Sequence, residues 1–216
     1  MRTLALLALV LLAGCIETRD FIKTEDGYKL AYTYYEGGHN GVILIHELGG
    51  NKEEWQSLTR ELERNEFSYL AIDLRGHGKS QGDWIYFDSD EFNEMIYDVK
   101  IAGTFLKERG VQIKGIVGAS IGANLALKYA KLWDIDKLVL LSPGINYKGI
   151  IITNDMVNYT GDVRVIAAID DSYSYTTSQM FQRDLNASFI KASGVAHGMD
   201  LLPEMNQYIL EFLKQV

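Results

Sequence analysis

The sequence of 216 residues contains only two prolines and one cysteine, and its four histidines are scattered along the chain. A single cysteine cannot form a disulfide within the chain, and the spacing of the histidines fits no zinc site. Its 21 basic residues, against 29 acidic ones, form no cluster, and the formal net charge is −8. Because sequence-independent binding of nucleic acid requires clustered basic side chains, we exclude that function class. Neither a metal nor another cofactor is expected.

An apolar run long enough to span a membrane is also missing near the start of the chain. The run from Leu4 to Ala13 has ten residues, whereas a membrane-spanning helix needs about 20. It follows the positive charge of Arg2 and has the length of the hydrophobic core of a signal peptide, which we predict to comprise residues 1–14.

The cysteine follows this run directly. Leu12-Ala13-Gly14-Cys15 resembles the lipobox of lipoprotein signal peptides, and this resemblance implies that Cys15 is lipidated and becomes the new N-terminus. We therefore expect residues 15–23 to carry the lipid and act as a tether, and the protein to be a membrane-anchored lipoprotein outside the cytoplasm. The alternatives are a plain secretory signal, which would release the protein, and a short buried helix with an unrelated cysteine.

Strand and helix patterns alternate along residues 24–216, which we expect to form one domain. Asp26-Gly27 predicts a hairpin turn. An apolar run typical of a strand buried on both faces covers residues 41–46, and a second buried strand is predicted at 68–73. Further strands are predicted at 114–119, 137–142, 163–169 and 189–192. Apolar residues at helical spacing predict a helix after Asn51, one from Asp88 or Ser89 to Gly110, and helices at 121–132 and 174–183. A last helix is predicted with Pro203 in its first turn. The alternation predicts an α/β fold with a mainly parallel central sheet and helices on both faces.

The segment 118–122, Gly-Ala-Ser-Ile-Gly, lies between a predicted strand and a predicted helix. This is the G-x-S-x-G pattern of a nucleophile elbow, in which a sharp turn exposes a serine at the carboxyl end of a parallel sheet. Ser120 is therefore the candidate nucleophile. The alternative is a tight glycine-rich turn that holds an ordinary serine.

A serine hydroxyl needs a base to accept its proton, and that base is usually a histidine held by a carboxylate. His197 is the best candidate, because it follows the last predicted strand and precedes the last helix. Asp171 is the preferred acid, with Asp170 as the second choice, because both follow the strand at 163–169. The backbone N–H groups of Leu48 and Ile121 are the expected donors to an oxyanion.

Several segments, in this order, resemble the α/β-hydrolase superfamily, in particular its esterases, lysophospholipases and serine aminopeptidase-like members. They are residues 45–50 (IHELGG), 73–80 (DLRGHGKS), 118–122 (GASIG), 170–171 (DD) and 194–198 (GVAHG). The resemblance implies hydrolysis through an acyl-enzyme, without a cofactor. One position departs from the family, which usually has glycine where this chain has Glu47. A carboxylate that pointed inward there would oppose an anionic transition state.

About 20 residues separate the strands that end near Ser142 and begin near Val163, too few for the helical cap domain that many members of the superfamily insert at this point. We therefore expect a minimal fold with an open cleft. Trp84, Tyr86 and Phe87 are expected either to form an apolar wall of that cleft or to belong to the core, and Tyr147 to line the rim.

The function that we predict is hydrolysis of carboxylic esters, with a small-molecule or lipid-like acyl substrate. A peptidase, a thioesterase or a dienelactone-hydrolase-like enzyme would use the same three side chains, and a surface binding module could keep the fold without turnover.

Overall fold

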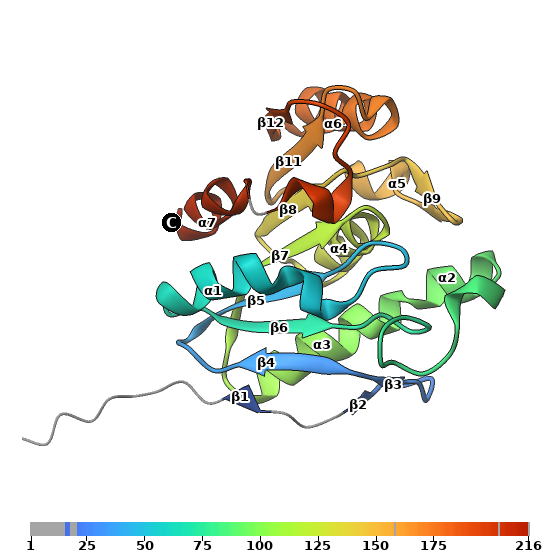
Figure 1. Ribbon diagram of the computed structural model, residues 1–216, viewed down its shortest axis with the longest axis vertical. Coiled ribbons are helices and arrows are strands. Elements are labelled where there is room, and N and C mark those ends of the chain that lie inside the picture. Colours follow the sequence, from blue (N-terminus) through green and yellow to red (C-terminus); the bar gives the residue numbers. More distant parts are fainter. Residues whose placement is uncertain (1–15, 18–20, 158, 203, 216) are drawn as a thin grey trace, which may run out of the picture.

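The computed structural model describes residues 16–17, 21–157, 159–202 and 204–215, so the predicted signal peptide and Cys15 lie outside the described residues. In the described part of the chain the central sheet has eight strands, in the order β1-β4-β6-β5-β7-β8-β11-β12 (Figure 1). Their bounds are β1 (Ile16–Glu17), β4 (Tyr32–Tyr35), β5 (Asn40–Ile45), β6 (Ser68–Ile72), β7 (Gln112–Ala119), β8 (Lys137–Leu141), β11 (Asp162–Ala168) and β12 (Ser188–Ala192).

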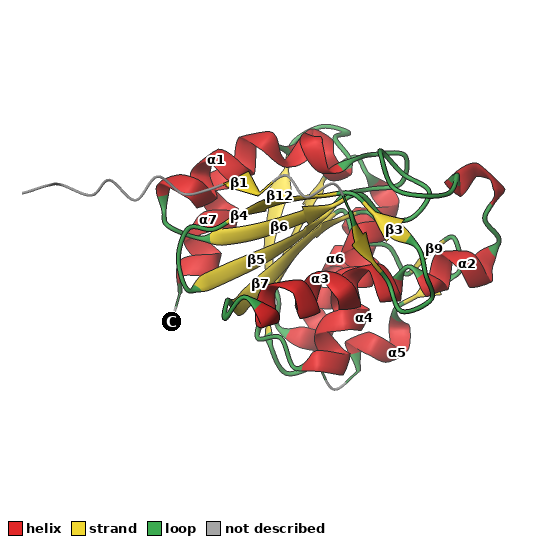
Figure 2. Cartoon of the chain, turned by 90° about the horizontal axis from the view of Figure 1, so that it is seen from below, coloured by secondary structure: helices red, strands yellow, loops and turns green. Residues whose placement is uncertain are grey.

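The sheet is parallel from β6 to β12, and β1 and β4 join it in antiparallel orientation. Helices α1 (Gln56–Arg64) and α7 (Asn206–Lys214) cover one face (Figure 2). The other face is covered by α3 (Ile96–Glu108), α4 (Ile121–Trp133) and α6 (Ser172–Leu185). The α/β fold expected from the alternating pattern is confirmed.

Strand β5 shows why its apolar run does not alternate with polar residues. Its side chains point in turn to the two faces of the sheet, and both faces are covered. Val42 and Leu44 pack with the core beneath α1 and α7, whereas Ile43 and Ile45 pack with the core beneath α3 and α4. All four side chains are fully buried.

Short elements connect the main layers. The predicted hairpin at Asp26-Gly27 joins β2 (Ile22–Lys23) to β3 (Lys29–Leu30). Between β8 and β11 the chain forms a second hairpin, β9 (Asn146–Tyr147) and β10 (Ile150–Ile151), and one turn of helix, α5 (Thr153–Met156). Within the described residues, the segment at the position of a cap domain consists of these short elements and forms no separate domain.

Two helix predictions differ from the structure. The helix predicted from Asp88 or Ser89 to Gly110 is two helices, α2 (Ser89–Glu94) and α3, separated at Met95, whose N–H bonds the carbonyl of Phe92 in a tighter i→i−3 turn. Asp88 is the N-cap of α2, as expected. Helix α7 begins at Asn206, after a 3₁₀ turn, η3 (Gly198–Leu201), and not near Pro203, a residue outside the described part.

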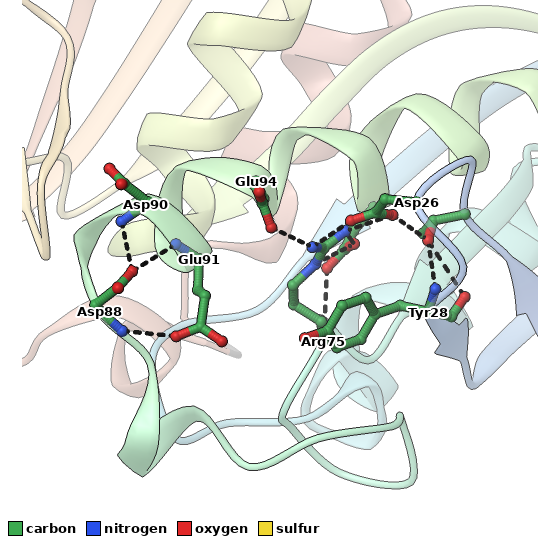
Figure 3. A network of polar contacts seen from close by, with 9 residues as sticks. Asp26, Tyr28, Arg75, Asp88, Asp90, Glu91 and Glu94 are labelled. Carbon is green, nitrogen blue, oxygen red and sulfur yellow. Dashed lines mark hydrogen bonds and ion pairs between the residues drawn. The ribbon is translucent and has the colours of Figure 1, made fainter.

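Buried Arg75, in the loop after β6, ties the N-terminal hairpin to the helical layer (Figure 3). Its backbone N–H and Nε donate to the two carboxylate oxygens of Asp98, at 2.7 and 2.9 Å. Its terminal nitrogens donate to Asp26 at 2.7 and 3.1 Å, and its guanidinium lies 4.3 Å from the ring centre of Tyr28. One cation thus connects a turn, a loop and α3.

Substitution of Asp98 by alanine would leave this guanidinium buried without its main partner. We expect Asp98→Ala to lower the free energy of unfolding by about 3–5 kcal/mol, as measured by urea denaturation. Glu61→Ala, which removes a pair with the largely exposed Arg64, should cost less than about 1 kcal/mol. Equal losses in the two variants would contradict the role given to Arg75.

Candidate active site

Ser120 lies at the sharp turn between β7 and α4, with φ 52° and ψ −116°. A positive φ is strained for a residue with a side chain. The turn is held by a hydrogen bond from the Ser120 N–H to the carbonyl of Leu141, at 2.8 Å, and by one from the Ala123 N–H to the carbonyl of Ser120, at 3.0 Å. The serine is only 6% exposed.

Glycines on either side of Ser120 make this turn possible. A Cβ at Gly118 would lie 2.3 Å from the carbonyl oxygen of Gly122. A Cβ at Gly122 would lie 2.3 Å from the carbonyl oxygen of Ile45 and 2.5 Å from that of His46. The first helical turn therefore packs against the end of β5 at a distance that only glycine allows.

The structure brings His197 and Asp171 to Ser120. The imidazole Nε2 lies 2.9 Å from Ser120 Oγ, and Nδ1 lies 2.7 Å from Asp171 Oδ2. All three residues follow strands of the parallel sheet, β7, β11 and β12, at the carboxyl edge where ligands of such sheets bind. The three preferred residues of the sequence prediction thus form one connected chain of hydrogen bonds.

The two adjacent aspartates have different surroundings. Asp170 is exposed, and its backbone N–H donates to the carbonyl of Gly194. Asp171 occupies the N-cap position of α6, yet its side chain makes no capping hydrogen bond and turns to His197 instead. The second-choice acid is therefore not the one that contacts the imidazole.

A cleft of about 350 Å³ opens beside Ser120. Its lining includes Leu48, Ile121, His197 and the tip of the β9–β10 hairpin. Among the hydrogen bonds of the described residues, none uses the backbone N–H of Leu48 or Ile121. Both predicted oxyanion donors therefore lie at the cleft with their hydrogen-bonding capacity free.

Glu47, the departure from the family pattern, lies half-buried in the wall of this cleft. Its Oε2 accepts a hydrogen bond from the backbone N–H of Met199 at 3.0 Å. Burial raises the pKa of Glu47, although the Met199 N–H and the nearby His197 favour its charged form. The carboxylate is thus engaged by the loop that carries His197.

His46, in the motif at residues 45–50, makes contacts that hold the fold together. His46 Nδ1 lies 2.6 Å from the carbonyl of Glu47, and its Nε2 accepts from the Leu74 N–H at 3.0 Å. Burial, together with the neighbouring His77, lowers the pKa of His46 to about 3, so the ring is neutral. It connects residues 46–50, which we call the oxyanion loop, to the loop after β6.

Of the residues predicted to contact substrate, the structure brings only Tyr147 to the cleft. Its ring centre lies 6.2 Å from that of His197, and burial raises its pKa to about 12, so the hydroxyl stays protonated. Trp84 stacks on His77 and Phe87 packs against Phe92. Tyr86 is 83% exposed. These three do not form a wall of the cleft.

Ser142, which follows β8, was not predicted to take part in the site. It is fully buried, has φ 48°, and its Oγ accepts the N–H of Gly198 at 3.0 Å. The Tyr147 hydroxyl donates to its carbonyl at 3.1 Å. No local pattern marks this residue, because its importance comes from contacts with segments distant in the sequence.

The described residues contain no group of three or more His, Cys, Asp or Glu side chains that could hold a metal ion. Within the same residues, no helix is both long and apolar enough to cross a membrane.

Comparison with known proteins agrees with this geometry. The family described as "Serine aminopeptidase, S33" matches residues 39–172. The "AB hydrolase superfamily protein YisY" of Bacillus subtilis is 28% identical over 56% of this chain and 44% of its own length. The "Pimeloyl-[acyl-carrier protein] methyl ester esterase" of Pectobacterium atrosepticum is 30% identical over 55% of this chain and 46% of its own. The match spans less than half the length of either relative.

Solved structures share the fold over nearly the whole chain. The esterase Pf2001 of Pyrococcus furiosus superposes with a TM-score of 0.76 at 20% identity, covering 99% of this chain and 96% of the esterase. Est1E of Butyrivibrio proteoclasticus, solved with ferulic acid bound, gives a TM-score of 0.70 at 18% identity, covering 88% and 98%.

The close approach at Gly122 leads to a prediction. In Gly122→Ala the new methyl group would push α4 away from β5 and displace Ser120, so we expect a stability loss of about 1–3 kcal/mol and a roughly 100-fold fall in any activity that uses this serine. Gly110→Ala is the control, because its Cβ would meet nothing within 4 Å; despite its positive φ it should leave that activity unchanged. Full activity in Gly122→Ala would contradict the packing argument.

Proposed function

We propose that this chain, which belongs to the serine aminopeptidase S33 family of α/β-hydrolases, hydrolyses carboxylic esters through an acyl-enzyme on Ser120. The observation that carries the proposal is the hydrogen-bonded chain from Ser120 to His197 to Asp171 beside a cleft of about 350 Å³. A cleft of this size suits a small-molecule ligand.

Each group has a defined task in the proposed reaction. Ser120 Oγ attacks the carbonyl carbon while His197 Nε2 accepts its proton. Asp171 accepts the Nδ1–H bond and stabilises the imidazolium. The N–H groups of Leu48 and Ile121 donate to the oxyanion, and the imidazolium then protonates the leaving alcohol. A water molecule, deprotonated by His197, releases the acid and restores the serine.

We favour an ester over a peptide as the substrate because one relative and several structural neighbours are named as esterases. A relative at 30% identity is a methyl ester esterase, and several solved structures with the same fold are esterases. The description of the family itself names an aminopeptidase, so peptides remain the second substrate class, followed by thioesters and lactones.

The nucleophile can be tested directly with a fluorophosphonate probe, which labels activated serines. We expect one adduct on Ser120, and none in Ser120→Ala at equal stability. Hydrolysis of p-nitrophenyl esters should fall by at least about 10³-fold in that variant. A folded protein that neither reacts with the probe nor cleaves any ester would support a binding module instead.

A second measurement distinguishes ester from peptide substrates. We expect turnover of p-nitrophenyl esters across a chain-length series, and much slower turnover of aminoacyl p-nitroanilides. The reverse preference would assign the chain to peptide hydrolysis with the same three side chains.

We further propose that the enzyme is held outside the cytoplasm by a lipid on Cys15. Support comes from the sequence alone, from the apolar run followed by Leu12-Ala13-Gly14-Cys15. The lipid would place the cleft near a membrane surface, where lipid-like esters are available.

Replacement of the cysteine tests this anchor. Cys15→Ser should move the protein from the membrane fraction to the soluble fraction without changing its hydrolysis of water-soluble esters. Membrane association that persists in Cys15→Ser would refute the lipid anchor and leave the proposed chemistry untouched.

A further inference from the structure

Glu47 is a half-buried carboxylate that the proposed reaction does not use, although it lies in the same cleft as Ser120. It belongs to the oxyanion loop, next to Leu48, and its side chain contacts the loop that follows His197. Its Oε2 accepts the Met199 N–H at 3.0 Å. One side chain therefore connects the two loops that must be correctly placed around the scissile bond.

Gly198 shows how closely these loops approach each other. A Cβ at this position would lie 1.7 Å from Glu47 Oε2, and the residue has a φ of +51°. Its N–H donates to Ser142 Oγ at 3.0 Å. The two backbone N–H groups after His197 are thus both held by side chains, one by Ser142 and one by Glu47.

Hydrogen bonding is not the only effect of this carboxylate, because it also carries charge close to the imidazole. Burial raises the pKa of Glu47, the Met199 N–H and His197 lower it, and the carboxylates of Glu54 and Asp200 raise it again. Glu47 therefore lies close enough to His197 for their charges to interact. Asp171 Oδ2 lies 2.7 Å from Nδ1 of the same ring, and the cationic Lys148 also lines the cleft.

We propose that Glu47 is a positioning residue for His197, which fixes residues 197–199 against the oxyanion loop and stabilises the imidazolium that forms during the reaction. The inference deepens the proposed function and rests on it. It also explains how the chain tolerates a carboxylate in this loop: the Met199 N–H binds the charge, and the imidazolium balances it when the oxyanion develops.

Two substitutions separate the two effects of Glu47. The amide oxygen of Glu47→Gln can still accept the Met199 N–H but carries no charge, whereas Glu47→Ala loses both the bond and the charge. We expect kcat/KM for a neutral p-nitrophenyl ester to fall about 3–10-fold in the glutamine variant, from the lost charge, and about 100-fold in the alanine variant, from misplacement of His197.

The pH dependence of kcat/KM shows whether the charge of Glu47 acts on the reaction or whether Glu47 makes only a structural contact. Neither variant keeps the carboxylate charge beside the reacting groups, so the acid limb of kcat/KM should move to lower pH in both variants. Asp200→Asn is the matched control: it removes a carboxylate from the same loop, but an exposed one, and should leave the limb in place.

A measurement that does not depend on turnover tests the role of Glu47 separately from the proposed function. Amide hydrogen exchange should show the Met199 N–H protected in the original protein and in Glu47→Gln, and exposed in Glu47→Ala. If esters are not cleaved but the Met199 N–H behaves as stated, the proposed substrate class is wrong and the positioning role of Glu47 stands.

The inference is overturned by two results. If the acid limb of kcat/KM does not move in Glu47→Gln, Glu47 has no electrostatic role. Unchanged protection of Met199 and unchanged kcat/KM in a folded Glu47→Ala would remove the positioning part.

Discussion

The close approach of α4 to the end of β5 is the constraint on which the candidate active site depends. Because Gly118 and Gly122 have no side chains, the helix can begin directly after the strand and its first turn can contact the backbone of Ile45 and His46. This geometry forces Ser120 into a strained conformation. It also brings Ile121 to the same cleft as Leu48, which follows β5, so the candidate nucleophile and the expected oxyanion donors are positioned by one contact.

Two loops at the carboxyl edge of the sheet, the oxyanion loop after β5 and the segment around His197 after β12, are held by hydrogen bonds to side chains. The neutral ring of His46 connects the oxyanion loop to the loop after β6, and Ser142 and Glu47 hold the residues after His197. Each of these contacts uses a backbone N–H or carbonyl that no strand could satisfy. The precision of the site therefore comes from hydrogen bonds between distant segments.

The sequence was sufficient to predict the fold and to select three side chains that the structure brings together, because both follow from local patterns. Unbroken apolar runs such as 41–46 identified strands buried on both faces, and the glycines around Ser120 identified the turn. The choice between Asp170 and Asp171 was harder, since adjacent residues share the same pattern. The contacts of Ser142 and Glu47 were not predictable, because they depend on side-chain directions across the sheet. Trp84 and Phe87 were ambiguous for the same reason: an aromatic residue beside a glycine-rich loop packs equally well against core or ligand.

The β9–β10 hairpin lines one part of the cleft and has a tight turn at its tip. Lys148 and Gly149 both have positive φ, as in the tight turns that match the twist of a hairpin. The turn is fixed by Asn146, which accepts the Gly149 N–H, and by Asn93, which donates to the Gly149 carbonyl. None of these bonds includes Ser120, His197 or Asp171. A longer segment from a relative could therefore replace residues 148–149. It would enlarge or narrow the cleft while Ser120, His197 and Asp171 keep their alignment.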